Sequence, residues 1–494
     1  MKRPYLNLSA ILLLLAMLIA AFSGCAGSGV ESGTTAGTTA AANPDSGEEQ
    51  TPEVTAVLPD IPDTMWNREF RVLGCGDKTS ISYPSFEIYA EDYTGEAMND
   101  SVFARNETLR KKYGITVSQT LIDKTHDRIS KNQSTGTDEF DLVFTFAYKV
   151  GALAQKGYFY DMHKVNYIDF SKPWWSKVEN DALSIKGHIY YTGSDYSLRD
   201  KNRVQVIVCN DALIEDKGLA PVPGLVRSGD WTAEKMAEYV NACADELDGD
   251  GRHTKADMFG LALSSYDCFA ALCFGCGVHL IDKDGSDGLV VVSDLDHDAA
   301  AVDAVLNIFR PETSMSPEDY GRDWDIASDT FEDGRALFTI NSIQYVSYYN
   351  QVCPFDYTVL PCPMLDKDQD AYYSMAEVRC MLFSIPVTNP DPDFAGFALE
   401  AFSYESTNTT KTTFIELYCK TRNVRNADSV DMLNIVLDTV VYDNSIIYSE
   451  TIPLYGILNS YVPVAKSNVF LRYMSSFKSK TQKEIDKINS DHAG

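Results

Sequence analysis

Acidic side chains alternate along one segment, residues 246–257, in a spacing that suits a divalent cation. In "ELDGDGRHTKAD" the ligand positions of a twelve-residue loop fall on Glu246, Asp248, Asp250, Arg252 (through its carbonyl) and Asp257, with Gly251 at the sharp turn. Hard cations such as Ca²⁺ take six or more oxygen ligands, which this alternation directs inward. Glutamate at position 1 departs from the usual aspartate. We expect either a structural calcium ion here or a solvated acidic turn, and no other cofactor.

A cysteine follows the apolar run near the N-terminus. Lys2 and Arg3 precede thirteen apolar residues, 10–22, and the run ends in Ser23-Gly24-Cys25. A positive start, a short apolar stretch and small residues are typical of a secretory signal, and the run is too short to span a membrane. The ending resembles the lipobox of bacterial lipoproteins, which implies a lipid on Cys25. An ordinary secreted protein is the alternative.

Patterns that would indicate other chemistry are missing from the sequence. GxSxG, HExxH and P-loop motifs are absent, and the seven histidines have no ligand spacing. The CxxC at 273–276 has no second pair nearby, so we expect buried free thiols rather than zinc. An extracellular glycan hydrolase would need two carboxylates about 5–10 Å apart. Many carboxylates are present, so this alternative stays open, although we expect a binding protein and not an enzyme.

Composition limits the partners of the chain. The formal net charge is −29, which argues against binding of nucleic acid or of an anionic lipid surface. About 470 residues follow Cys25, a length that favours two lobes over one domain. Residues 26–60 are rich in Gly, Ser and Thr and predict a flexible tether.

Strands and helices alternate from residue 69 onward. Apolar runs at 70–76, 115–122, 140–148 and 203–210 predict strands. The segment 98–114 predicts a helix that Asn99 or Asp100 caps and Gly114 ends. Further helices are predicted in 149–162, 230–248 and 390–406. This rhythm predicts an α/β fold with mostly parallel sheets covered by helices.

Several of these stretches, taken together, resemble one family. "MNDSVFARNETLRKKYGITV", "GDWTAEKM", "FEDGRALFTI" and "IPVTNPDPDFAGFALEAFSYES" occur in the order found in the extracellular solute-binding proteins of ATP-binding-cassette importers. The resemblance covers roughly residues 66–445 and implies a two-lobed fold of the periplasmic-binding-protein type (type II), with a hinge between the lobes. It also implies the carbohydrate-type subclass. "LPCPMLDKDQ", 360–369, departs from the family pattern.

The resemblance gives the predicted organisation of the chain. We expect a signal peptide at 1–24 and a tether at 25–65. Lobe one is expected to hold 66–203 and 363–420, and lobe two 204–362 and 421–494. The chain is then a monomeric receptor, anchored by lipid at the extracytoplasmic face of the membrane, which hands a small polar solute, a sugar or oligosaccharide, to an ATP-binding-cassette permease.

Candidate solute contacts follow the predicted strand ends. Ligands of open α/β sheets bind at the carboxyl ends of the strands, and sugars need aromatic rings for their C–H faces and paired polar groups for their hydroxyls. Tyr148 also falls, by resemblance, where maltose-type binders place a stacking ring. The candidates are Tyr148, Trp174, Trp175, Asp195, Arg203, Tyr266, Asn341, Tyr345 and Arg379. Packing in the core or on the surface is the alternative for each.

Overall fold

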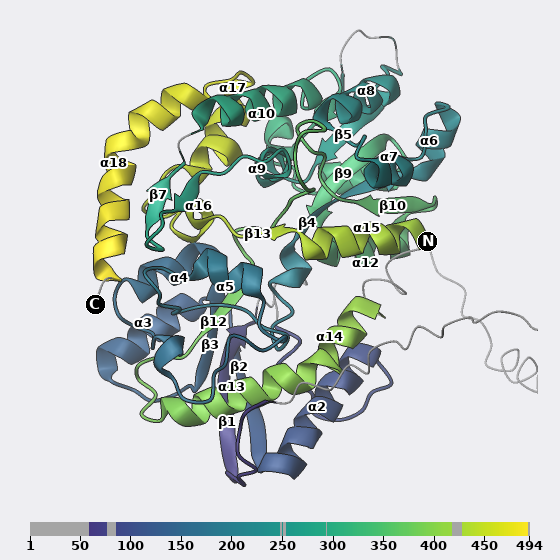
Figure 1. Ribbon diagram of the computed structural model, residues 1–494. Helices are drawn as coiled ribbons and strands as arrows, with labels where there is room; N and C mark the ends of the chain where they lie inside the picture. The colour runs from purple at the N-terminus through teal and green to yellow at the C-terminus, as the bar shows by residue number, and fades with distance from the viewer. Residues whose placement is uncertain are drawn as a thin grey trace, which may run out of the picture. The chain divides into compact units, whose positions relative to one another are not determined.

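Two β-sheets organise the chain (Figure 1). The computed structural model describes residues 59–76, 85–247, 249, 253–292, 294–416 and 427–492. Cys25, the predicted signal peptide and most of the predicted tether lie outside these residues. No helix of the described residues is long and apolar enough to cross a membrane.

The first sheet has four strands in the order β12-β3-β1-β2 and forms the centre of lobe one. Its strands are β1 (Arg68–Cys75), β2 (Ile115–Ile122), β3 (Leu142–Phe146) and β12 (Met381–Ser384). The first three are parallel, and β12 is antiparallel to β3. All five residues of β3 are buried, as expected for a strand covered on both faces.

The second sheet has five strands in the order β10-β4-β9-β5-β8 and forms the centre of lobe two. Its strands are β4 (Gln205–Asn210), β5 (Phe259–Leu263), β8 (Ser314–Met315), β9 (Ala336–Ser342) and β10 (Tyr357–Leu360). Strand β5 is parallel to β8 and β9, whereas β4 is antiparallel to β9 and β10. Two small sheets add β6 (Ile281–Lys283) with β7 (Leu289–Val291), and β11 (Ser374–Met375) with β13 (Val440–Val441).

Helices cover these sheets. Those of the first half are α2 (Ala97–Tyr113), α3 (Thr125–Thr135), α4 (Ala147–Ala154), α5 (Lys177–Leu183), α6 (Asp211–Asp216), α7 (Val222–Ser228), α8 (Ala233–Cys243) and α9 (Tyr266–Gly275). Those of the second half are α10 (Leu295–Ile308), α11 (Ile326–Glu332), α12 (Val346–Val352), α13 (Pro392–Thr407), α14 (Thr410–Thr412), α15 (Ala427–Asp438), α16 (Asn444–Ile447), α17 (Val462–Ala465) and α18 (Phe470–Asp491). Short 3₁₀ or π turns are η2 (Met162–Lys164), η3 (Lys201–Arg203), η4 (Pro317–Tyr320), η5 (Ile343–Tyr345) and η7 (Ile457–Tyr461).

For the helix predicted at 98–114, the sequence indicates the C-terminal end correctly but not the N-terminal cap. Gly114 ends α2 in the left-handed conformation, at φ 66°, where glycine is strongly favoured. The predicted cap is wrong: Glu96 caps the helix by accepting from the Asn99 N–H at 2.9 Å. Asp100 instead accepts from the Thr94 and Gly95 N–H groups of the preceding loop.

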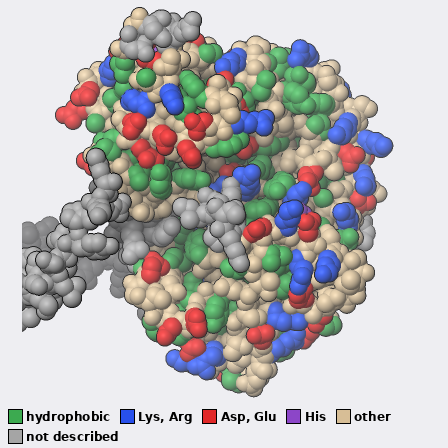
Figure 2. Space-filling view, turned by 180° about the vertical axis from the view of Figure 1, so that it is seen from behind, with side chains coloured by type: hydrophobic (Ala, Val, Ile, Leu, Met, Phe, Trp, Pro, Cys, Tyr) green, Lys and Arg blue, Asp and Glu red, His purple; other side chains and the backbone are tan. Residues whose placement is uncertain are grey.

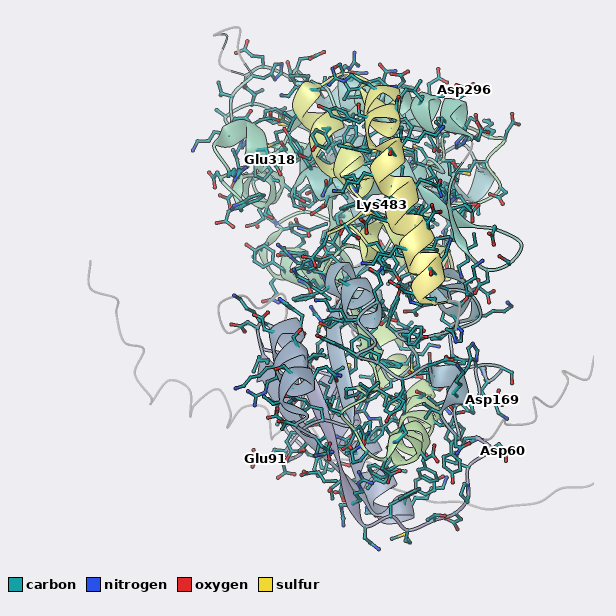
Figure 3. All side chains as sticks on the ribbon, turned by 90° about the vertical axis from the view of Figure 1, so that its left-hand side faces the viewer. Asp60, Glu91, Asp169, Asp296, Glu318 and Lys483 are labelled. Carbon is teal, nitrogen blue, oxygen red and sulfur yellow. The ribbon has the colours of Figure 1, made fainter. Side chains whose placement is uncertain are left out.

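Chain segments far apart in sequence complete each lobe. Helix α13 packs against α2 in lobe one, and Phe402 of α13 stacks on Phe70 of β1 with ring centroids 5.4 Å apart. Helix α15 packs on β10 in lobe two. Helix α18 runs beside β7, and its Lys483 lies on the side facing the viewer in Figure 3. The exact lobe boundaries stay a prediction.

A carboxylate lies in the core of lobe one between two tryptophans. Glu400 of α13 accepts from the indole N–H of Trp174 at 3.0 Å and from that of Trp175 at 2.9 Å. Both rings are buried, at 1% and 3% exposure. Burial raises the pKa of Glu400 to about 7, although these hydrogen bonds oppose the rise.

We expect Glu400→Gln to reduce the pH dependence of stability. The folded pKa lies above the ordinary value, so the native state binds an extra proton and this stabilisation is lost as pH rises through about 7. The wild type should therefore lose up to roughly 3 kcal/mol from this group between pH 4 and 8. Urea unfolding at several pH values measures the slope, and an unchanged slope in the variant would contradict the assignment.

Candidate functional site

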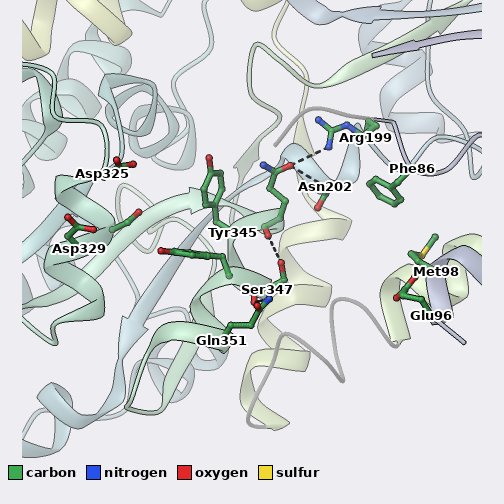
Figure 4. Close-up of a pocket in the computed structure, with 13 residues that line it drawn as sticks. Phe86, Glu96, Met98, Arg199, Asn202, Asp325, Asp329, Tyr345, Ser347 and Gln351 are labelled. Atoms are coloured by element: carbon green, nitrogen blue, oxygen red, sulfur yellow. Dashed lines mark hydrogen bonds between the residues drawn. The ribbon is translucent and has the colours of Figure 1, made fainter. Parts of the chain in front are cut away.

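A pocket of about 610 Å³ brings together residues from both lobes (Figure 4). Lobe one contributes Phe86, Glu96 and Met98, the latter two at the start of α2. The segment before β4 contributes Arg199 and Asn202. On the face shown in Figure 2, the surface is hollowed between the upper and lower halves, with acidic and hydrophobic side chains above the hollow.

Most of the pocket wall comes from lobe two, where the chain leaves strand β9. The segment contributes Gln344, Tyr345, Ser347, Tyr348 and Gln351, and α11 together with its N-cap residue contributes Asp325, Ser328 and Asp329. In the first segment Ile343, Val346 and Tyr349 are buried in the lobe core. Because a helix places residues three and four apart on one face, burial of this set leaves the residues between them to face the pocket.

Hydrogen bonds join four polar residues that form the floor of the pocket: Arg199, Asn202, Gln344 and Ser347. Gln344 Oε1 accepts from Arg199 Nη1 at 3.3 Å and from Asn202 Nδ2 at 3.4 Å. Ser347 Oγ donates to the Gln344 carbonyl at 2.9 Å. Figure 4 shows these bonds beside Tyr345, with Glu96 and Met98 across the space from Asp325 and Asp329. The pocket thus presents aromatic rings next to amides, a hydroxyl and carboxylates.

Tyr348 of this wall and Glu332, which lies next to it outside the pocket lining, have shifted pKa values. Burial raises the pKa of Tyr348 to about 12, and its neighbour Glu332 adds to the rise. Burial also raises the pKa of Glu332, with Asp325, Asp329 and Asp333 contributing in the same direction. Near pH 7 the Tyr348 hydroxyl is therefore protonated.

Of the predicted contact residues, Tyr345 is the one that lines this pocket. Asn341 lies close by at the end of β9, where its side chain donates to the Tyr349 hydroxyl at 3.4 Å. Tyr148 packs on Phe146 with ring centroids 5.9 Å apart. Tyr266 is buried at the start of α9.

The other predicted contacts lie in the core or in a turn. The structure places Trp174 and Trp175 in the core with Glu400 and not in the pocket. Asp195 is buried and pairs with Lys411 at 2.7 Å. Arg379 is exposed in a turn.

The predicted calcium segment is described only in part. Asp248, Asp250 and Arg252 lie outside the described residues. Glu246 is half-buried. Asp257 is buried and accepts from the N–H groups of Leu247 at 2.8 Å and Thr254 at 2.6 Å, which lower the pKa of Asp257. Within the described ranges no group of acidic, His or Cys residues could hold a metal ion. The calcium site stays a prediction.

The sequence pattern around β9 could have identified more of the pocket. Gln344, Ser347, Tyr348 and Gln351 directly follow the same strand end as Tyr345. The polar residues of α11 also share one helix face. The sequence pattern did not identify Arg199 and Asn202 as pocket residues, because they precede β4 rather than follow a strand.

The fold and this pocket define the class of protein. Residues 104–416 match the family model of bacterial extracellular solute-binding proteins, and the chain belongs to that family. Members of it act outside the cytoplasm and bind solutes, and both family and fold are those of binding proteins. A comparison with curated protein sequences gave no match.

Solved structures share the two-lobed fold. A cyclo/maltodextrin-binding protein complexed with maltotetraose is 14% identical with a TM-score of 0.55, over 86% of this chain and 96% of that one. The galacto-N-biose/lacto-N-biose I-binding protein of Bifidobacterium longum is 12% identical with a TM-score of 0.55, over 87% and 99%. UspC of M. tuberculosis is 10% identical with a TM-score of 0.53, over 86% and 100%. These likenesses show the fold.

A buried ion pair lies where the chain passes between the lobes. Arg203 ends η3, just before β4, and pairs with Glu377. Arg203 is 3% exposed and Glu377 7%. Gln205 donates to the same carboxylate at 3.3 Å. Arg203, a predicted solute contact, therefore takes part in a buried structural pair.

We expect Glu377→Ala to destabilise the protein by about 3–5 kcal/mol, because it leaves a buried guanidinium without its counter-charge. The double variant Arg203→Met with Glu377→Leu should lose less than the single one. Glu107→Ala, which removes the exposed pair with Arg110, is the control and should cost about 1 kcal/mol or less. Urea unfolding that gave equal losses for Glu377→Ala and Glu107→Ala would contradict the role of the pair.

Proposed function

We propose that this protein is a lipid-anchored receptor that captures a sugar or oligosaccharide between its lobes and delivers it to an ATP-binding-cassette permease. The observation that carries the proposal is the pocket between the lobes, where the rings of Phe86, Tyr345 and Tyr348 lie beside amide and carboxylate side chains. Rings that stack on sugar C–H faces and polar groups that pair with hydroxyls are the two contacts a carbohydrate requires.

The sugars named for two structural neighbours belong to this class of solute. The cyclo/maltodextrin-binding protein was solved with maltotetraose, and the Bifidobacterium longum protein with lacto-N-biose. Capture would work by hinge closure, because a solute that contacts both lobes favours the closed state by its differential affinity. Within this proposal the solute leaves chemically unchanged, which separates the receptor from a glycan hydrolase.

Replacing Tyr345 or Tyr348 by alanine should weaken solute binding about 5- to 150-fold, the scale of one buried aromatic contact. Titration calorimetry with the oligosaccharide that gives the largest thermal shift, from a panel including maltotetraose and lacto-N-biose, measures the affinity. Tyr473→Ala is the matched control, since this ring stacks on Tyr461 of lobe two outside the pocket. Wild-type affinity in both pocket variants, or cleaved sugar by mass spectrometry, would refute the proposal.

The anchor is tested separately, since Cys25 lies outside the described residues. The motif Ser23-Gly24-Cys25 supports it. Cys25→Ala should release the protein into the medium or leave an uncleaved precursor, because the acceptor of the lipid is gone. Fractionation of cells with mass measurement of the product distinguishes these outcomes from a processed, membrane-bound variant, which would be inconsistent with lipidation.

A further inference from the structure

The charged side chains that line the pocket are mostly acidic. Glu96 lies on the lobe-one side, and Asp325 and Asp329 lie on the lobe-two side (Figure 4). Among the described lining residues, Arg199 is the one with a Lys or Arg side chain. The described part of the pocket wall therefore presents three carboxylates and one guanidinium to a solute.

The guanidinium of Arg199 is held in the wall by the protein's own groups. Arg199 is 1% exposed and donates to Gln344 Oε1 at 3.3 Å. Its charge also acts on buried Glu87: burial raises the pKa of Glu87, and Arg199 opposes that rise. The Arg199 guanidinium therefore interacts with Glu87 inside lobe one as well as with Gln344 at the pocket.

The two carboxylates of α11 are placed differently. Asp325 and Asp329 are exposed at the pocket, and no Lys or Arg in the described part of the chain pairs with them. Asp333, the residue that follows the end of α11, does pair with Arg335 at 2.8 Å. Asp325 and Asp329 also contribute to the raised pKa of Glu332, as described above.

A buried acceptor provides a second, independent sign of a ligand rich in donors. Asn202 is 3% exposed and lines the pocket. Its Nδ2 donates to Gln344, but its Oδ1 is buried and accepts no hydrogen bond from the described residues. A buried acceptor without a donor is costly, so a donor on the solute would be favoured here. Tyr345 and Tyr348 add ring faces, which attract cations.

We propose that the solute of this pocket is a carbohydrate with a protonated amine, of the glucosamine type, and that anionic sugars are rejected. The inference rests on the carbohydrate function proposed above and specifies its solute class. The ammonium group would lie near Asp325 and Asp329, and hydroxyl donors elsewhere on the sugar would meet acceptors such as Asn202 Oδ1. A carboxylate on the sugar would meet like charges instead, which is unfavourable at close range.

The test compares sugars that differ in charge. The full chain is titrated with β-1,4-linked tetramers of glucosamine, N-acetylglucosamine and glucose, and with maltotetraose and tetragalacturonate. We expect the glucosamine tetramer to bind at least about tenfold more tightly than its neutral counterparts at an ionic strength of about 0.01 M. The difference should narrow at about 0.15 M, because salt screens exposed charges. Tetragalacturonate should not bind.

Two sets of substitutions locate the selectivity. Asp325→Asn with Asp329→Asn should remove most of the preference for the amine, to within about threefold of the neutral sugars. Asp333→Asn, which removes a paired charge directly after the same helix and outside the pocket lining, should keep the preference. Equal affinity for charged and neutral tetramers, or a preference that survives the double substitution, overturns this inference while the receptor function stands. Failure of every carbohydrate to bind overturns the proposed function itself and this inference with it.

Discussion

Charged side chains are buried where the chain passes from lobe one to lobe two, and their loss of hydration must be offset on the spot. Arg203 is paired with Glu377, whose carboxylate also accepts from Gln205. Two residues earlier, the Lys201 ammonium donates to Asp200 at 2.8 Å, and also to two backbone carbonyls. These ion pairs and hydrogen bonds restrict the conformations open to the backbone of this segment.

The geometry of the pocket depends on this segment, which connects the two lobes. Arg199 and Asn202 lie in the same short segment, so the ion pairs that fix it also fix the floor of the pocket and its bonds to Gln344. Lobe one supplies one wall of the pocket and lobe two supplies the other. Each wall therefore moves together with the sheet of its own lobe. Relative movement of the lobes would therefore change the distance between the walls while the floor stays in place, as a hinge mechanism requires.

The sequence predicted the features that depend on local interactions. The alternation of apolar strands and helices, and the end of a helix at Gly114, need only neighbouring residues to be recognised. Tyr345 was predicted because it closely follows the end of a strand, β9, in the sequence. Trp174 and Trp175 could not be placed, since their partner Glu400 is more than two hundred residues away. Arg199 was missed for the same reason: its place in the pocket depends on contacts between distant segments.

The cysteines have a consequence for the lifetime of this protein. The nine described cysteines are all buried, and burial raises the pKa values of several of them, including Cys209 and Cys380. Thiolate, the form that reacts with oxidants and disulfides, is therefore scarce in the folded state. Once unfolded outside the cell, the same chain exposes many ordinary thiols to oxidation and wrong cross-linking. Its survival there is then set by the rate of unfolding rather than by the equilibrium between folded and unfolded states.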